Sequence, residues 1–209
     1  MICIVDYGLG NIRSVQKALC RIGIDSFVSS NYKDFNLASH FLLPGVGHFK
    51  KGMDNLRSKD LISPLNEFVL EKRKPVLGIC LGMQLMTQFS EEGDVEGLGW
   101  IPSKTLAFKG RIEGLKIPHM GWNSLNITSQ GSWLPCEDNI LQYYFVHSYF
   151  ISCENIDHIS ATTKYGVELV SSFHFENIYG TQFHPEKSHD QGLALLKNFY
   201  TKAVCSDHE

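Results

Sequence analysis

Short, continuously apolar runs alternate with amphipathic stretches through the first half of the chain. Residues 2–5 form an apolar run rich in β-branched side chains, and the turn YGLGN leads into a helical pattern that ends at Gly23. Further strands are predicted at residues 27–28, 41–43 and 76–79, with a helical region through Leu70 that breaks near Pro64. Strands that are apolar throughout and alternate with helices are typical of a parallel sheet covered on both faces. The first half therefore predicts an α/β fold.

From about residue 95 the pattern changes to short alternating or aromatic strands that Gly, Pro and Asn separate. Such strands are predicted at residues 141–151, 158–163 and 166–175. We expect them to be antiparallel, either added to the same sheet or forming a small neighbouring one. Residues 190–204 predict a closing helix. The sequence contains no internal repeat or linker, so a single domain over residues 1–209 is expected.

Composition and charge narrow the class of protein. A chain of 209 residues that is 43% hydrophobic can bury a core as one domain, and a net charge of -3 without a dense Lys/Arg tract predicts no nucleic-acid and no membrane partner. The start MICIVDYG is too short for a signal peptide, and no stretch approaches the roughly 20 apolar residues of a membrane span. The six scattered cysteines, without a C-x-x-C pair, are interpreted as reduced thiols. We expect a cytoplasmic protein.

A cysteine stands between two glycines in the stretch VLGICLGMQ, where a predicted strand turns into a helix. Cys80 would lie at the first turn of that helix, where unpaired N–H groups and the helix dipole favour the thiolate. Gly78 and Gly82 would permit the strained turn that presents a nucleophile at the carboxyl edge of the sheet. From this stretch alone, a buried structural cysteine beside glycines that allow close packing remains an alternative.

A histidine and a carboxylate occur together in the segment YGTQFHPE. His184 and Glu186 are two residues apart at the end of an apolar-aromatic strand, so in an extended segment they project on the same side. A carboxylate placed there can hold the imidazole tautomer and stabilise the imidazolium, as in a catalytic triad. We therefore predict a triad of Cys80, His184 and Glu186, and we interpret His147, in an aromatic strand, as a hydrogen-bonded core or near-site residue.

The same segment is dense in metal-ligand types, which leaves a metal site as an alternative to the triad. Its ligands would come from His174, Glu176, His184, Glu186 and His189. Their spacing matches neither a helical H-x-x-x-H face nor a zinc pattern. We therefore expect no metal and no cofactor.

Three motifs taken together resemble a known family: GICLG at residues 78–82, HPE at 184–186 and PGVG at 44–47. They are similar to motifs of the class I (triad-type) glutamine amidotransferases, and the similarity spans essentially the whole chain. The resemblance implies a flavodoxin-like α/β fold, with a central, mostly parallel sheet flanked by helices and an added antiparallel portion in the second half. Within the family, the segments IVDYGLGNIRSV, KIPHMGWN and YGTQFHPEKS are similar to the branch that serves histidine biosynthesis with a separate (β/α)8-barrel partner.

The resemblance implies a glutaminase reaction. Cys80 would attack the carboxamide of glutamine, and His184 would protonate the departing ammonia and then activate the water that releases glutamate from a thioester. The oxyanion would be held by the N–H of Leu81, the residue after the nucleophile, and by the loop that contains Val46 and Gly47.

Two further residues are implied to bind glutamine: Gly45 in the PGVG loop, and Gln84, one helical turn after Cys80. The alternatives are an ordinary turn after a strand and a solvent-facing polar side chain. Because glycine makes the PGVG loop movable, we expect an incomplete oxyanion hole in the chain without its partner.

The resemblance also implies a surface for the barrel partner. The residues at matching positions are Asn11, His119, Met120, Trp122 and Lys187, and a Trp flanked by Gly, Met and His suits an interface anchor. The alternative is that His119, Met120 and Trp122 pack a loop, and that Asn11 and Lys187 are ordinary surface residues.

Other functions compete with a glutaminase of histidine biosynthesis. A paralogous subunit could supply ammonia for amidation of a surface-polysaccharide sugar, because the stretch EGLGWIPSKTLAFKG departs from the GxIxGxV pattern of the histidine branch. A free-standing cysteine hydrolase could use the same triad but would need no partner. A non-catalytic regulator that kept the fold is the third alternative.

Overall fold

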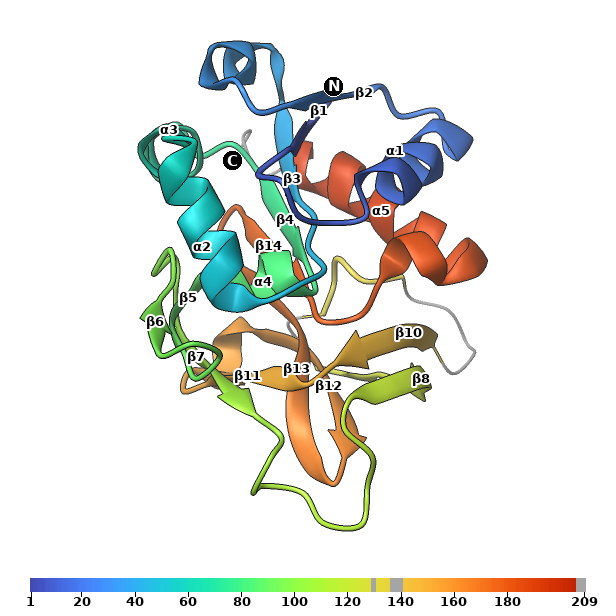
Figure 1. The fold of residues 1–209 in the computed structure, drawn as a ribbon. Helices are drawn as coiled ribbons and strands as arrows, with labels where there is room; N and C mark the ends of the chain where they lie inside the picture. Colours follow the sequence, from blue (N-terminus) through green and yellow to red (C-terminus); the bar gives the residue numbers. More distant parts are fainter. Residues whose placement is uncertain (129–130, 136–140, 206–209) are drawn as a thin grey trace.

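Successive residues of a strand point to opposite faces of the sheet. The central strands are buried at every position, so helices cover both faces. The computed structural model describes residues 1–128, 131–135 and 141–205, with side chains as far as residue 203. Cys3 and Val5 pack in a core with Phe49 and Met53, whereas Ile2 and Ile4 pack in a second core on the opposite face. Figure 1 shows the two helical layers around the central strands.

The first half alternates strands and helices as predicted. Its elements are β1 (Ile2–Val5), α1 (Ile12–Arg21), β2 (Ser26–Ser29), η1 (Tyr32–Leu37), β3 (His40–Leu43), α2 (Phe49–Ser58), α3 (Ile62–Asn66), η2 (Glu67–Glu71), β4 (Val76–Ile79) and α4 (Leu81–Leu85). The break in the helical region lies at residues 59–61, just before Pro64. Pro64 itself occupies the first turn of α3, where a missing N–H removes no intrahelical hydrogen bond.

The second half is mostly antiparallel. Its elements are β5 (Thr87–Ser90), β6 (Val95–Glu96), β7 (Ile101–Ala107), β8 (His119–Ser124), β9 (Asn126–Ile127), β10 (Gln142–His147), β11 (Tyr149–Cys153), η3 (Ile156–His158), β12 (Ile159–Tyr165), β13 (Val167–Phe175), β14 (Ile178–Thr181), η4 (Pro185–Lys187) and α5 (His189–Cys205). The closing helix is therefore confirmed.

The larger sheet has the order β2-β1-β3-β4-β14-β13-β11-β7-β5-β6, and β8 pairs with β10 in a separate two-stranded sheet. The strands from β2 to β14 are parallel, in the order of a flavodoxin-like sheet, and β13 and β11 extend it as antiparallel strands. The predicted α/β fold with an added antiparallel portion is confirmed.

One predicted strand is two strands in the structure. The segment 141–151 divides at Ser148, with β10 in the small sheet and β11 in the large one, because the chain changes sheets at that residue. This break places residues 146–149 beside the end of β4, and the sequence pattern alone showed no sign of it.

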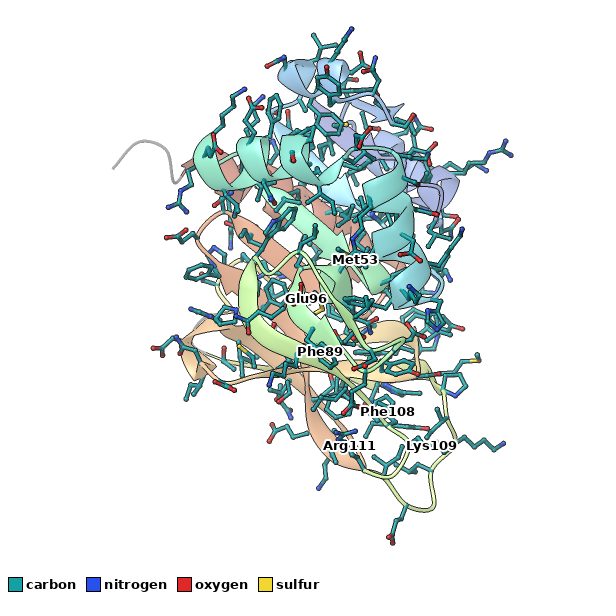
Figure 2. All side chains as sticks on the ribbon, turned by 60° about the vertical axis from the view of Figure 1, so that its left-hand side comes forward. Met53, Phe89, Glu96, Phe108, Lys109 and Arg111 are labelled. Carbon is teal, nitrogen blue, oxygen red and sulfur yellow. The ribbon has the colours of Figure 1, made fainter. Side chains whose placement is uncertain are left out.

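The far edge of the large sheet is covered by α2 on one side. In Figure 2, Met53 of α2 lies above Phe89 and Glu96, which pair between β5 and β6, and Phe108, Lys109 and Arg111 follow below in the loop after β7. A bidentate pair between Arg111 and Glu91 ties that loop back to the sheet and lowers the pKa of the carboxylate.

Four cysteines, Cys3, Cys20, Cys80 and Cys153, carry free thiols as predicted. The cysteines at positions 136 and 205 lie outside the described side chains. In the described part of the chain, none of the helices is long and apolar enough to cross a membrane.

Candidate active site

The strand-to-helix turn after β4 presents Cys80 in a strained backbone conformation. Its φ is 53° and its ψ is -106°, a region that L-residues rarely adopt, and α4 begins at the next residue. The Cys80 N–H donates to the carbonyl of Thr181 at 2.7 Å, which fixes the turn to the end of β14. The predicted nucleophile elbow is thus present.

The two flanking glycines are needed because the backbone approaches too closely for a side chain. A Cβ at Gly78 would lie 2.6 Å from the backbone nitrogen of Met83. A Cβ at Gly82 would overlap the carbonyl oxygen of Leu43 on the neighbouring strand. The glycines therefore permit close packing and the elbow together.

His184 and Glu186 follow β14, the parallel neighbour of β4, with His184 just before η4 and Glu186 within it. The Nδ1 of His184 is 2.9 Å from Oε1 of Glu186, and both side chains are 1% exposed. The Nε2 of His184 is buried, and the Cys80 side chain is the second charged neighbour of the imidazole. The parallel strands bring the three predicted triad residues together.

One contact with β10 and one with Ser188 hold His184 in place. Its backbone N–H donates to the carbonyl of Tyr144 at 2.9 Å, and its carbonyl accepts from the hydroxyl of Ser188 at 2.6 Å. Ser188 also accepts from the N–H of Tyr144 at 3.1 Å. The imidazole is thereby fixed from the backbone side as well as by Glu186.

The charges around His184 favour the imidazolium. Burial alone would lower the pKa of His184, but the Cys80 thiolate and the Glu186 carboxylate outweigh burial and raise it. An imidazolium paired with a thiolate is the state in which a cysteine attacks and the histidine then donates its proton.

Gln182 is a site residue that the sequence analysis missed. Its Nε2 donates to Sγ of Cys80 at 3.7 Å, and its Oε1 accepts from Nε2 of Gln84 at 3.0 Å. The available signal was its position two residues before His184; in the structure the chain bends after β14 at Gln182 and enters η4 at Pro185.

Gln84 is buried rather than solvent-facing. Its Nε2 donates both to Gln182 and to the carbonyl of Tyr149, at 3.0 Å. With both amide hydrogens used, the group that Gln84 can offer a ligand is its carbonyl oxygen.

The PGVG loop packs directly on the elbow. A Cβ at Gly45 would lie 2.5 Å from the backbone nitrogen of Gly82, and the loop is held from below by the hydroxyl of Tyr7, which donates to the Pro44 carbonyl at 2.7 Å. The N–H of Leu81 donates to the carbonyl of Gly45 at 3.4 Å. One of the two predicted oxyanion donors is therefore engaged by the loop.

A cavity of about 270 Å³ opens at Cys80. It is lined by Val46, Gly47, Cys80, Leu81, Gln84, Glu92, Pro118 and residues 146–149. The predicted nucleophile, oxyanion loop and Gln84 thus share one small-molecule pocket.

Glu92 is a second residue that the sequence analysis missed. Its carboxylate faces the cavity and accepts a hydrogen bond at 2.6 Å from the N–H of Phe49, at the start of α2. No motif in the sequence marked it, because it follows β5 in a loop whose position depends on the whole sheet.

The five residues predicted at a partner surface divide into two groups. Met120 and Trp122 are 62% and 47% exposed, Lys187 is exposed and Asn11 is half-buried. His119, in contrast, is 2% exposed, and its ring bonds to His147 and Asn123. Its alternation with Met120 along β8 turns it inward, so its side chain is not available at the surface.

The side chains that could have formed the alternative metal site do not lie together around one point. Within the described ranges, no group of three or more His, Cys, Asp or Glu side chains is arranged to hold a metal ion. The ring of His174 stacks on Tyr179, and that of His189 stacks on Trp122.

Comparisons with known proteins agree with this geometry. The family model described as glutamine amidotransferase class-I matches residues 3–203. The imidazole glycerol phosphate synthase subunit HisH 2 of Methanococcus maripaludis is 44% identical over 206 residues, covering 97% of this chain and 100% of the relative. Subunit HisH 1 of Campylobacter jejuni is 47% identical, covering 95% and 98%, and subunit HisH of Bacillus cereus is 47% identical, covering 95% and 93%.

Solved structures share the fold at low sequence identity. A glutamine amidotransferase has a TM-score of 0.77 at 15% identity, covering 97% of this chain and 98% of the other. PurLQS from Thermotoga maritima has a TM-score of 0.74 at 16% identity, covering 96% and 97%.

Proposed function

The chain belongs to the class I glutamine amidotransferase family, and from that premise we propose that it is the glutaminase subunit of an imidazole glycerol phosphate synthase. The observation that carries the proposal is a cavity lined by Cys80, whose side chain adjoins the buried His184–Glu186 pair, in a chain so similar to HisH subunits. The resemblance seen in the three sequence motifs is thereby confirmed.

The reaction follows from the positions of the triad. The Cys80 thiolate attacks the side-chain carboxamide of glutamine, and His184 gives its proton to the nitrogen that leaves as ammonia. The bond that remains is a γ-glutamyl thioester. His184, now neutral, takes a proton from water, and the hydroxide releases glutamate and restores the thiolate. Glu186 accepts the hydrogen bond from the Nδ1–H of His184 throughout the reaction.

The oxyanion donors need a rearrangement before this chemistry. Leu81 donates to Gly45, so its N–H becomes free for the substrate when the PGVG loop shifts, and the same shift can turn the peptide between Val46 and Gly47 toward the site. Gly47 has a φ of 136°, which glycine alone adopts readily. We propose that partner binding drives this shift and so switches the glutaminase on.

Glutamine recognition uses charge at the mouth of the cavity. Glu92 suits the α-ammonium of glutamine, while Gln84 and Gly45 help to place the rest of the molecule. We expect Glu92→Gln to raise the KM for glutamine about tenfold with kcat changed less than threefold, because one ion pair to a ground-state group is lost. Initial rates over a glutamine series measure it, and an unchanged KM would remove Glu92 from the substrate site.

The surface for the partner is proposed to lie beside the triad. The ring centroids of Trp122 and Tyr144 are 6.2 Å apart, and Nζ of Lys187 lies 5.6 Å from the centroid of the same Tyr144 ring. Met120, on the same strand as Trp122, is exposed. Asn11 is the N-cap of α1, and α1 packs against η4, which contains Lys187. This patch of exposed apolar and basic groups suits a (β/α)8-barrel synthase that takes up the ammonia in a heterodimer.

One experiment tests the proposed function. Glutamate release by the purified chain is measured alone and with a histidine-pathway barrel subunit and its nucleotide ligand, alongside Cys80→Ala. We expect near silence without the barrel, strong activation with it, and a loss of activity of several orders of magnitude in Cys80→Ala. Full activity of the chain alone would favour a free-standing cysteine hydrolase instead.

One observation favours a second candidate function, in which the ammonia is delivered to an acceptor outside histidine biosynthesis. Four of the similar relatives carry the number 1 or 2 after the subunit name. Such numbering fits organisms with two copies, of which one can serve another acceptor, such as a surface-polysaccharide sugar. Complementation of a histidine auxotroph lacking this subunit, with the matching barrel supplied, separates the two, and failure to grow would favour the sugar pathway.

We also propose that residues 1–209 form a single glutaminase domain. The antiparallel strands β13 and β11 continue the same sheet as the parallel strands, which supports one folding unit. A single cooperative unfolding transition by both circular dichroism and tryptophan fluorescence is expected. A cytoplasmic location stays a prediction.

A further inference from the structure

Two buried histidines outside the triad face each other beside the glutamine cavity. His119 on β8 and His147 on β10 are 2% and 6% exposed, and His147 lines the cavity. They are opposite residues of the two-stranded sheet, and Nδ1 of His119 lies 2.9 Å from Nε2 of His147. The glutaminase reaction described above gives neither of them a task.

The hydrogen-bond partners determine where each ring carries its proton. The Nδ1 of His147 lies 2.7 Å from the carbonyl oxygen of Tyr149, and because a carbonyl only accepts, this nitrogen donates. The Nε2 of His147 therefore accepts from Nδ1 of His119. The Nε2 of His119 in turn accepts from the side-chain amide of Asn123 at 3.2 Å.

Both rings are consequently neutral and have the same tautomer. A second proton on His147 would point from its Nε2 at the Nδ1–H of His119. A second proton on His119 would point from its Nε2 at the donating amide of Asn123. In both cases two donors would face each other. Burial also lowers the pKa of His119 to about 4 and that of His147 to about 3, so both stay uncharged at neutral pH.

The chain of hydrogen bonds continues to the nucleophile. The Tyr149 carbonyl accepts from His147 and also from Gln84, at 3.0 Å. Gln84 donates to Gln182 at 3.0 Å, and Gln182 donates to Sγ of Cys80 at 3.7 Å. At the other end, the Asn123 amide donates to the carbonyl of Lys164 on β12.

Aromatic rings enclose the pair. His119 is stacked between Phe145 and Tyr165, with ring centroids 4.8 Å and 4.0 Å away, and Phe108, labelled in Figure 2, lies 5.3 Å from the ring of His147. Because the surroundings are aromatic, a phenylalanine substituted for either histidine can keep the packing while removing the hydrogen bonds. The two contributions can therefore be tested separately.

We propose that His119 and His147 are positioning residues of the glutaminase site: a neutral, directional imidazole pair that fixes the Tyr149 carbonyl and, through it, the wall of the glutamine cavity. The inference rests on the proposed glutaminase function for its kinetic consequences only. Because Met120 and Trp122 are carried by the same strand as His119, the pair also links the proposed partner surface to the cavity.

The first test observes the tautomers directly. In the full chain labelled with ¹⁵N-histidine, long-range ¹H–¹⁵N spectra at pH 7 are expected to show two imidazoles protonated at Nδ1 alone, unchanged down to about pH 5. His119→Phe and His147→Phe assign the two signals. A charged ring or an Nε2–H tautomer at either position overturns the proposal, whether or not the chain is a glutaminase.

The second test separates positioning from packing. His147→Phe is expected to raise the KM for glutamine roughly tenfold, with kcat changed less than threefold, because the cavity wall loses one hydrogen bond of ordinary strength. His147→Asn keeps a donor near Nδ1 and is expected to restore KM to within about threefold of the wild type. An unchanged KM in His147→Phe overturns the proposal.

A matched control is available in His174→Phe. That ring also stacks on a tyrosine and bonds a backbone carbonyl, at Glu176, but it lies on β13 away from the cavity. We expect its KM to stay at the wild-type value, and an equal rise in KM would show that loss of any such histidine loosens the fold.

Labelling of Cys80 distinguishes failure of this proposal from failure of the proposed function. A chloroketone analogue of glutamine requires the cavity, whereas iodoacetamide requires only the thiolate. We expect His147→Phe to slow labelling by the first about tenfold and by the second less than threefold. Equal rates with the chloroketone for wild type and variant would overturn the positioning role even if no acceptor barrel activates the chain.

Discussion

Replacing Glu186 by glutamine removes one negative charge from the centre of the site while keeping the side-chain shape. The carboxylate accepts from Nδ1 of His184 at 2.9 Å, and both groups are almost completely buried. Glutamine would offer either an amide hydrogen, which demands the wrong imidazole tautomer, or a neutral oxygen that stabilises the imidazolium much less. The change therefore acts on the charge of His184 and on its orientation.

The magnitude follows from the distance and the burial. Two unit charges about 4 Å apart interact by about 4 kcal/mol at an effective dielectric constant near 20. Each 1.4 kcal/mol in a barrier is tenfold in rate, so the loss of this pair lowers kcat/KM by about 10²- to 10³-fold. Alkylation of Cys80 should also slow, because the imidazolium beside it loses the charge of Glu186.

Two measurements check this prediction. Glutamine hydrolysis is followed with the barrel partner present, and alkylation of Cys80 by iodoacetamide is followed against pH in the chain alone. The matched control is Glu67→Gln, which breaks an exposed ion pair to Lys72 and should change both rates less than twofold. A Glu186→Gln enzyme within tenfold of the wild type would refute the argument that this buried carboxylate holds the catalytic imidazolium.

Three further changes have expected outcomes. Gly82→Ala should destabilise the fold by more than about 3 kcal/mol and abolish activity, because its Cβ would overlap the Leu43 carbonyl oxygen; soluble yield and Tm report it. Tyr7→Phe should lower the free energy of unfolding by about 1–2 kcal/mol, measured in urea, because the buried Pro44 carbonyl loses its donor. On going from pH 7 to pH 5, the free energy of unfolding of the wild type should fall by about 2 kcal/mol through the imidazole of His147. The reason is that the unfolded chain protonates this imidazole in that range and the folded chain does not. In urea titrations His147→Phe should lack this part of the loss.

Matched variants make these outcomes interpretable. Gly52→Ala places a Cβ near side-chain atoms alone, the methyl groups of Leu85 and the ring of Tyr7, so its Tm should fall far less than that of Gly82→Ala. Tyr32→Phe removes a hydroxyl from a half-exposed ring and should leave the free energy of unfolding within about 0.5 kcal/mol. A Gly82→Ala chain as stable as Gly52→Ala, a Tyr7→Phe chain as stable as Tyr32→Phe, or equal acid sensitivity of His147→Phe and wild type would each contradict the reasoning.

Much of the site could be predicted from local sequence because local geometry builds it. The glycines around Cys80 mark a strand-to-helix turn. His184 and Glu186 are paired as predicted, although Glu186 lies in η4 and not in the extended segment that the sequence predicted. Apolar runs that alternate with helices predict a parallel sheet, and parallel strands bring their carboxyl ends to one edge. These features depend on backbone conformation within a few residues, which the sequence specifies directly.

The rest depended on contacts between segments far apart in the chain. The division of residues 141–151 at Ser148 depends on which sheet accepts each half, and that choice places the Tyr149 carbonyl against Gln84. Glu92 reaches the cavity only because β5 pairs with β7 beyond the antiparallel strands.

The sequence by itself therefore predicted Cys80, His184 and Glu186 as the proposed triad, and it determined the α/β architecture that brings them together. Only the tertiary structure decided that His119 turns inward to His147, that Leu81 donates to Gly45, and that Gln182 contacts the thiol. The physical reason is that side-chain hydrogen bonds across strands depend on sheet register and burial, and neither is set until the whole sheet has formed.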